Sequence, residues 1–105
     1  MRFAWLLPAA AVLFAPGVAS ASAETITVTI DKLVFSPAQI SVKAGDTVEW
    51  VNKDALAHTA TVKGGWDVMI PPKATATMVV EKAESVAFFC RFHPNMKGRL
   101  TATER

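Results

Sequence analysis

Near its C-terminus the chain gathers three soft metal donors in one short stretch, FFCRFHPNMKG (88–98). Cys90 is followed by His93 three residues later and by Met96 three residues after that. Few such donors are available, because the chain contains one cysteine, two histidines and four methionines. The other histidine, His58, stands where the segment NKDALAHTATV leaves a predicted loop and enters a predicted strand. These four residues are the candidates for metal chemistry.

Two imidazoles and one thiolate, with a weakly bound thioether, form the ligand set of blue-copper electron-transfer sites. The thiolate gives the electron a covalent path to the metal, the imidazoles bind both Cu(II) and Cu(I), and the thioether helps to set the potential. A loop can turn the three donors of 90–96 toward one point, whereas a strand would alternate them between two faces. The pattern therefore favours a mononuclear copper site.

Zinc is the other metal to consider. His58, Cys90 and His93 would supply three ligands, and an acidic residue such as Asp54 or Asp67, or a water, would have to be the fourth. Zinc has no use for a thioether. Taken singly, each residue also has an ordinary structural role, since a lone cysteine is usually a small buried hydrophobe and a methionine can fill the core.

Residues 1–23 have the pattern of a secretory signal. Arg2 precedes an apolar stretch that prolines interrupt, and the small residues ASA (21–23) provide a cleavage site. The apolar stretch is shorter than the roughly 20 residues that a spanning helix needs. We therefore predict a cleaved signal at 1–23, a mature domain at 24–105, export to the periplasm and no membrane span after cleavage.

The predicted mature chain is nearly neutral, with ten basic residues against nine acidic ones once Arg2 is removed. The basic residues are scattered rather than clustered, which argues against a nucleic-acid partner. A single cysteine in an exported protein cannot form an internal disulfide, so it is a free thiol or a ligand. A domain of this size also commonly gains stability from a bound metal.

Short alternating segments predict an all-β fold. In TITVTI (25–30), Ile26, Val28 and Ile30 share one face and the threonines share the other. The segment AQISVKAGDTVEWVN reads as two strands joined at the turn Ala44–Asp46. Further strands are expected at 58–62, 66–70, 74–81, 85–90 and 98–104, with Pro71 marking an edge strand or a loop. Seven to eight short strands predict a two-sheet antiparallel β-sandwich.

The mature chain resembles the cupredoxins, and among them the small amicyanin-like and plastocyanin-like blue copper proteins. The resemblance is carried by FSPAQISVKAGDTVEWVN, by AHTATV and by FFCRFHPNMKGRLTA, which contains the amicyanin pattern Cys-x2-His-Pro-x-Met. It implies a Greek-key sandwich and one type 1 copper ion per chain. By this resemblance His58, Cys90, His93 and Met96 are the four copper ligands.

The chain departs from the family pattern at two positions beside the ligands. Thr59 follows the first ligand histidine, where the family often has an asparagine that braces the site. Phe92 precedes the second histidine, where amicyanins tend to have proline. Neither departure removes a ligand.

The resemblance implies a periplasmic one-electron carrier that cycles between Cu(II) and Cu(I). Its redox donor and acceptor would dock near His93, on a patch for which the candidates are Ala55, Leu56, Pro71, Pro94 and Asn95. The exposed cations Lys97 and Arg99 could steer an acidic partner. We expect a monomer.

The other function to weigh is a periplasmic copper carrier or resistance protein of the same fold. An enzyme is not expected, because both histidines are already used in the proposed site and none remains for a second copper centre or a hydrolytic base.

Overall fold

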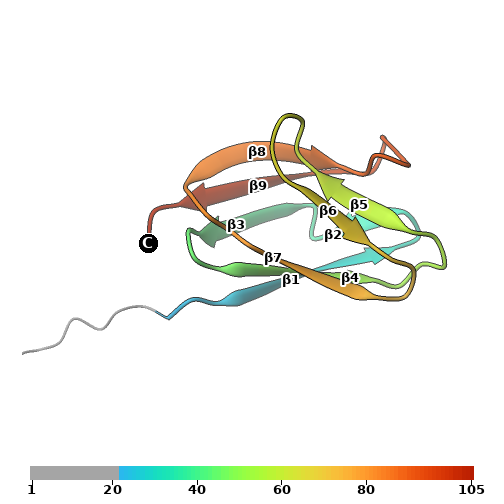
Figure 1. Ribbon diagram of the computed structural model, residues 1–105, viewed down its shortest axis with the longest axis horizontal. Coiled ribbons are helices and arrows are strands. Elements are labelled where there is room, and N and C mark those ends of the chain that lie inside the picture. The colour runs from blue at the N-terminus through green and yellow to red at the C-terminus, as the bar shows by residue number, and fades with distance from the viewer. Residues whose placement is uncertain (1–21) are drawn as a thin grey trace, which may run out of the picture.

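The computed structural model describes residues 22–105 as two β-sheets packed face to face (Figure 1). The first sheet has the strand order β2-β1-β4-β7 and the second has the order β3-β9-β8-β5-β6. The bounds of the strands are β1 Thr25–Asp31, β2 Val34–Ser36, β3 Gln39–Lys43, β4 Thr47–Asn52, β5 His58–Thr61, β6 Asp67–Ile70, β7 Thr75–Val79, β8 Glu84–Phe89 and β9 Lys97–Thr103. The prediction of an all-β sandwich is confirmed.

The described residues contain no helix, and therefore none that could cross a bilayer. The predicted signal segment 1–23 lies outside the described residues except for its last two positions.

Alternation along the strands builds the core between the sheets. In β1, Val28 and Ile30 are fully buried, while Thr25 and Thr27 are exposed. The centre of the core is aromatic, with the ring centroids of Trp50 and Phe88 5.2 Å apart in an edge-on arrangement. Cys90 and Met96 belong to the same buried cluster, so the loop that carries them rests directly on the core.

The strand number and the strand directions differ from the prediction. The described residues form nine strands rather than seven to eight, because the three residues of β2 are too few to show an alternating pattern. The sheets are also mixed rather than antiparallel, since β1 pairs with β4 and β3 pairs with β9 in parallel. The predicted strand near 66–70 is confirmed as β6, at the edge of its sheet.

The parallel pairs arise because the described chain passes from one sheet to the other five times, and two of these crossings are short turns. The turn at 44–46, where Gly45 has a φ of 96°, connects β3 in one sheet to β4 in the other. Residues 80–83 connect β7 to β8 in the same way. Consecutive strands still pair within one sheet at β1–β2, β5–β6 and β8–β9, whereas the parallel neighbours β1 and β4, and β3 and β9, come from separate parts of the chain.

Candidate metal centre

Two consecutive turns form the loop between β8 and β9. The His93 N–H donates to the Cys90 carbonyl at 3.2 Å, and the Met96 N–H donates to the His93 carbonyl at 2.8 Å. Each of these is the hydrogen bond of a β-turn. A third bond, from the Cys90 N–H to the Met96 carbonyl at 3.1 Å, closes the loop at its base. The equal spacing of the three donor residues thus places each of them at the end of a turn.

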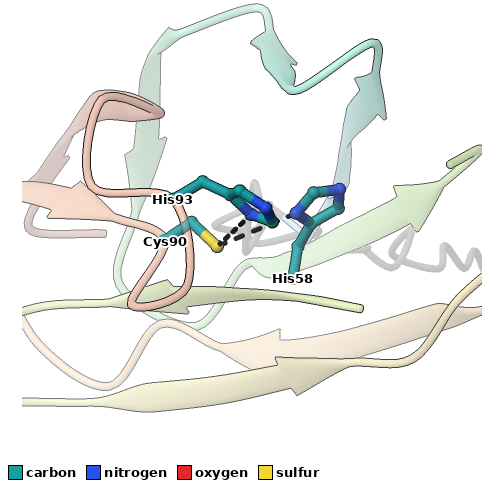
Figure 2. A group of neighbouring side chains, drawn as sticks. All are labelled: His58, Cys90 and His93. Atoms are coloured by element: carbon teal, nitrogen blue, oxygen red, sulfur yellow. Dashed lines mark hydrogen bonds between the residues drawn. The ribbon is translucent and has the colours of Figure 1, made fainter. Parts of the chain in front are cut away.

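Three of the four predicted ligands converge on one point (Figure 2). The Nδ1 atom of His58 lies 3.7 Å from Sγ of Cys90, and the Nδ1 atom of His93 lies 3.8 Å from the same sulfur. One possible ligand atom from each residue lies within 4.8 Å of the other two. His58 and Cys90 are 32 positions apart in the sequence, and the fold brings them together because β5 pairs with β8.

The distances between the Cys90 sulfur and the two histidine Nδ1 atoms fit a single first-row metal ion. Bonds of about 2.3 Å to sulfur and about 2.0 Å to nitrogen, separated by an angle of about 120°, place the two donor atoms about 3.7 Å apart. A tetrahedral angle with the same bonds would place them only about 3.5 Å apart. The observed 3.7 and 3.8 Å are close to both values, so the two nitrogens and the sulfur are spaced to hold one ion. Two imidazoles and a thiolate are the donor set of type 1 copper.

Met96 lies at the base of the same loop and is buried. Only 4% of its surface is exposed, and it packs in the core cluster that also contains Cys90. Both its backbone N–H and its backbone carbonyl take part in the hydrogen bonds described above. The role of Met96 as a thioether ligand stays a prediction.

His58 is held from behind by Asp54. His58 is fully buried, and its Nε2 atom lies 2.9 Å from Oδ2 of Asp54. The same carboxylate accepts the backbone N–H groups of Lys32 at 2.7 Å and Leu33 at 3.0 Å, in the turn between β1 and β2. The backbone carbonyl of Asp54 accepts the N–H of Lys73 at 3.1 Å. Asp54 therefore joins three connections of the sandwich to one imidazole.

The ionisation state of Asp54 determines the tautomer of His58. Burial alone would raise the pKa of Asp54, but hydrogen bonds from the Leu33 and Lys32 N–H groups and from His58 outweigh it and hold the pKa below its usual value. The ionised carboxylate can only accept hydrogen bonds. The Nε2 atom of His58 must then carry the proton, which leaves the Nδ1 lone pair directed toward Cys90.

Asn52 joins the loop before His58 to the turn after β6. Its buried side-chain Nδ2 donates to the carbonyls of Leu56 at 2.9 Å and Pro71 at 3.0 Å, and its Oδ1 accepts the Asp54 N–H at 2.8 Å. This amide fixes the course of residues 53–57, from which the chain enters β5 at His58.

Thr59 connects the strand of the first histidine to the ligand loop. Its backbone N–H donates to Sγ of Cys90 at 3.4 Å, and its hydroxyl oxygen accepts the Arg91 N–H at 2.8 Å. The Thr61 hydroxyl lies 2.9 Å from the Thr59 hydroxyl and 2.5 Å from Asp67, which receives two hydrogen bonds from the Arg91 guanidinium at 3.0 and 3.2 Å. We call Thr59, Thr61, Asp67 and Arg91 the threonine brace. It links the start of β5, which carries His58, to the loop that carries Cys90.

The second departure from the family pattern, Phe92, lies at the surface. Its side chain is 48% exposed, and its ring centroid lies 5.4 Å from the Arg91 guanidinium carbon. The neighbouring His93 is half-buried, in contrast to the fully buried His58.

From the sequence, Asp54 and Asp67 were possible fourth ligands of zinc, but in the structure both have other contacts. Asp54 contacts the outer nitrogen of His58, and Asp67 contacts Arg91 and Thr61. Neither belongs to the group of converging donor atoms. Their actual roles depend on contacts between distant segments, for which the sequence carries no local signal.

Comparison with known proteins agrees with this architecture. A family model described as a cupredoxin-like domain matches residues 3–102. Amicyanin from Paracoccus versutus is 30% identical over 90 residues, which cover 78% of this chain and 67% of that protein. Plastocyanin from Scenedesmus fuscus is 29% identical over 84 residues, which cover 66% of this chain and 86% of that protein.

Solved structures show the same relationship. The reduced Cu(I) form of an amicyanin mutant at pH 4 has a TM-score of 0.68 and 26% sequence identity, over 79% of this chain and 84% of that one. The resemblance drawn from the sequence motifs is thereby confirmed. The chain belongs to the cupredoxin-like domain family.

Proposed function

We propose that the protein is a one-electron carrier with one type 1 copper ion held by His58, Cys90, His93 and Met96. The observation that carries this proposal is the convergence of both histidines and the only cysteine of the chain on one point. The similarity to an amicyanin structure in its Cu(I) form supports copper rather than zinc. When bound, copper supplies the Cu(II)/Cu(I) couple.

The protein's own residues keep the donor atoms in place. His58 and Cys90 are fully buried, and each is fixed by hydrogen bonds from outside the donor group. A site held in this way changes little when the charge at its centre changes, because its donors are restrained by the fold rather than by the ion. Small rearrangement is what fast electron exchange requires.

His93 provides the route to a partner, since it is the half-buried member of the group. The patch proposed around it is exposed throughout, and it consists of Ala55, Leu56, Pro71, Pro94 and Asn95. The Asn52 amide supports this arrangement, because it binds the carbonyls of both Leu56 and Pro71 and so keeps two members of the patch together.

Export and processing complete the proposal. Residues 1–23 direct the chain to the periplasm and are removed, and residues 24–105 work there as a monomer. The signal pattern supports export and processing. Mass spectrometry of protein recovered from the periplasm should give a chain that begins at Glu24, and size-exclusion chromatography should give the mass of one chain.

No enzymatic activity is proposed. Both histidines of the chain lie in the donor group, so neither is available to a hydrolytic Cys–His pair or to a second copper centre.

Protein-film voltammetry of the copper-loaded protein tests electron transfer. We expect one reversible one-electron wave, together with rapid self-exchange between the oxidised and reduced forms. An irreversible wave, or self-exchange too slow to measure, would favour the alternative of a copper-handling protein with the same fold. A protein that binds zinc but does not bind copper would contradict both.

A further inference from the structure

Basic residues are concentrated at one end of the sandwich. Four connections meet around the donor group, namely 32–33, 53–57, 71–74 and 90–96, and they form the right-hand end in Figure 1. Three of them are joined through Asp54, and the fourth contains Cys90 and His93. The charged residues in these connections are Lys32, Lys53, Asp54, Lys73 and Arg91.

The opposite end has no such excess of basic residues. Its connections, 44–46, 62–66 and 80–83, and the two ends of the described chain contain the charged residues Glu24, Asp46, Lys63, Glu81, Lys82, Glu104 and Arg105. Acidic residues outnumber basic ones there, whereas basic residues outnumber acidic ones around the donor group. The chain as a whole is nearly neutral, so this polarity is local.

Within residues 22–105, three lysines at the site end have no acidic partner. Lys32, Lys53 and Lys73 are exposed, and none forms an ion pair there; we call them the basic rim. Asp54, in the same group of connections, is occupied by His58 and by backbone N–H groups, while Asp67 pairs with Arg91. Asp31, beside Lys32, is the exposed acid that remains at this end. Lys97 and Arg99, also exposed, add two charges where β9 begins.

Apolar side chains are exposed at the same end. Of the six large hydrophobic residues exposed in the described part of the chain, four belong here. These are Leu33, Val34, Leu56 and Phe92, which are between 43% and 55% exposed. An apolar centre with a polar rim is the usual composition of a surface that binds another protein.

We infer that this end docks a redox protein whose own docking face is acidic, an inference that rests on the electron-carrier function proposed above. Unpaired lysines around an apolar contact attract an acidic surface and orient it before contact. Such steering raises association rates by about 10-fold to 1,000-fold at low ionic strength. The lysines come from three separate connections rather than one stripe, which fits a compact protein face better than a nucleic-acid backbone.

A single cytochrome in two charge states provides the probe. Native cytochrome c is basic around its haem edge, and succinylation converts its lysines to carboxylates while the haem is kept. The reduced form of each is mixed with the Cu(II) protein in a stopped-flow instrument, at ionic strengths between about 10 mM and 500 mM, which span Debye lengths from about 30 Å to a few Å. At low ionic strength we expect the succinylated cytochrome to react at least tenfold faster than the native one, after correction for the difference in their reduction potentials. This difference in rate should vanish at high ionic strength.

Two double variants separate the local charge from the net charge. K53E/K73E reverses two charges of the basic rim and should abolish the preference for the succinylated cytochrome. K63E/K82E makes the same change in net charge at the opposite end and should alter the rates by less than about twofold. All four lysines are exposed, and both variants should keep the visible spectrum and melting temperature of the parent protein.

Equal rates with both cytochromes at low ionic strength, or equal effects of the two double variants, would overturn the docking inference and leave the electron carrier intact. Failure of both cytochromes and of ferrocyanide to reduce the protein would instead overturn the proposed function. Co-sedimentation with phosphatidylglycerol vesicles that K53E/K73E abolishes, without a preference between the cytochromes, would also overturn the inference, in favour of a membrane surface.

Discussion

The two ends of the sandwich are closed by the same arrangement, an aspartate that ties separate chain segments together. At the site end Asp54 accepts two backbone N–H groups and contacts His58. At the opposite end Asp46 accepts the N–H groups of Glu24 at 3.0 Å and Lys43 at 2.8 Å and pairs with Arg105. The third partner differs, since one aspartate binds an arginine and the other binds an imidazole of the donor group.

This difference shows that an aspartate which joins chain segments can also orient a residue of the donor group. Asp46 holds the start of β1, the end of β3 and the C-terminal arginine, which are all parts of the scaffold. Asp54 does the same for its own end and in addition fixes one nitrogen of His58, so that the other nitrogen faces Cys90. We therefore expect changes at the opposite end to affect stability alone, and changes at the site end to affect both stability and the metal centre.

The largest effect is expected from Gly98→Ala, immediately after the ligand loop. A Cβ at this position would lie 2.3 Å from the Phe88 ring and 2.5 Å from the Ala38 carbonyl oxygen. Relief of such a clash should cost about 3 kcal/mol or more of the free energy of unfolding. Urea unfolding of the metal-free protein measures the loss.

Gly64→Ala provides the control at the opposite end. A Cβ at this position would meet no described residue within 4 Å apart from its chain neighbours, so only the φ of 76° opposes the change. A left-handed alanine costs about 1 kcal/mol. Equal losses for the two variants would show that the site end is not the more tightly packed of the two.

The next largest effect is expected from Asp54→Asn, and it should differ from the effect of the same change at Asp46. Asp54→Asn should lower the free energy of unfolding by about 1–2 kcal/mol, because a charged hydrogen-bond acceptor is lost. It should also weaken copper binding by about tenfold, as changes behind a ligand histidine commonly do. Unfolding of the metal-free protein and competition with a copper chelator measure the two effects separately.

Asp46→Asn should destabilise the fold without changing copper affinity or the visible spectrum. If it weakened copper binding as much as Asp54→Asn, the division between a structural end and a functional end would be wrong.

The threonine brace should give a smaller effect. Thr59→Val keeps the shape of the side chain but removes the hydroxyl that accepts the Arg91 N–H, at a cost of about 1 kcal/mol. Because the brace restrains the loop that carries Cys90, the visible spectrum should also shift. Thr77→Val, on an exposed position of β7, is the matched control and should stay within about 0.5 kcal/mol of the parent. A spectrum unchanged in Thr59→Val would contradict a bracing role.

The smallest effect is expected in the pH dependence of stability. Hydrogen bonds from Glu24 and Lys43, helped by Arg105, outweigh burial and hold the pKa of Asp46 below its ordinary value of 3.8. The unfolded chain then binds more protons than the folded one, so the stabilisation is complete above that value and is lost as the pH falls through the folded pKa. Thermal unfolding of the metal-free protein between pH 7 and pH 3, at about half-unit steps, should show a shallower decline for Asp46→Asn than for the parent. An identical decline would contradict this contribution.

The sequence was sufficient to predict the parts of the site that lie close together in the chain. The equal spacing of Cys90, His93 and Met96 follows from two consecutive turns, and turns are local structures. His58 could be assigned because it is the only other histidine. The contacts behind the ligands could not be predicted, since Asp54 binds Lys32 and Leu33 more than 20 positions away.

The fold, like the site, could be predicted from the sequence only in part. Alternation in β1 and the succession of short predicted strands indicated a sandwich, and the structure confirms it. The crossings between sheets were not predictable, because Gly45 signals a turn without showing whether the next strand pairs with the previous one or joins the other sheet. The parallel pairs follow from these crossings.

Titration of the metal-free protein with Cu(II), followed by visible absorption, tests the central claim most directly. We predict an intense thiolate-to-copper band that saturates at about one equivalent and is absent in Cys90→Ser. A colourless complex, or a band that persists in Cys90→Ser, would contradict a type 1 copper site built on His58, Cys90 and His93.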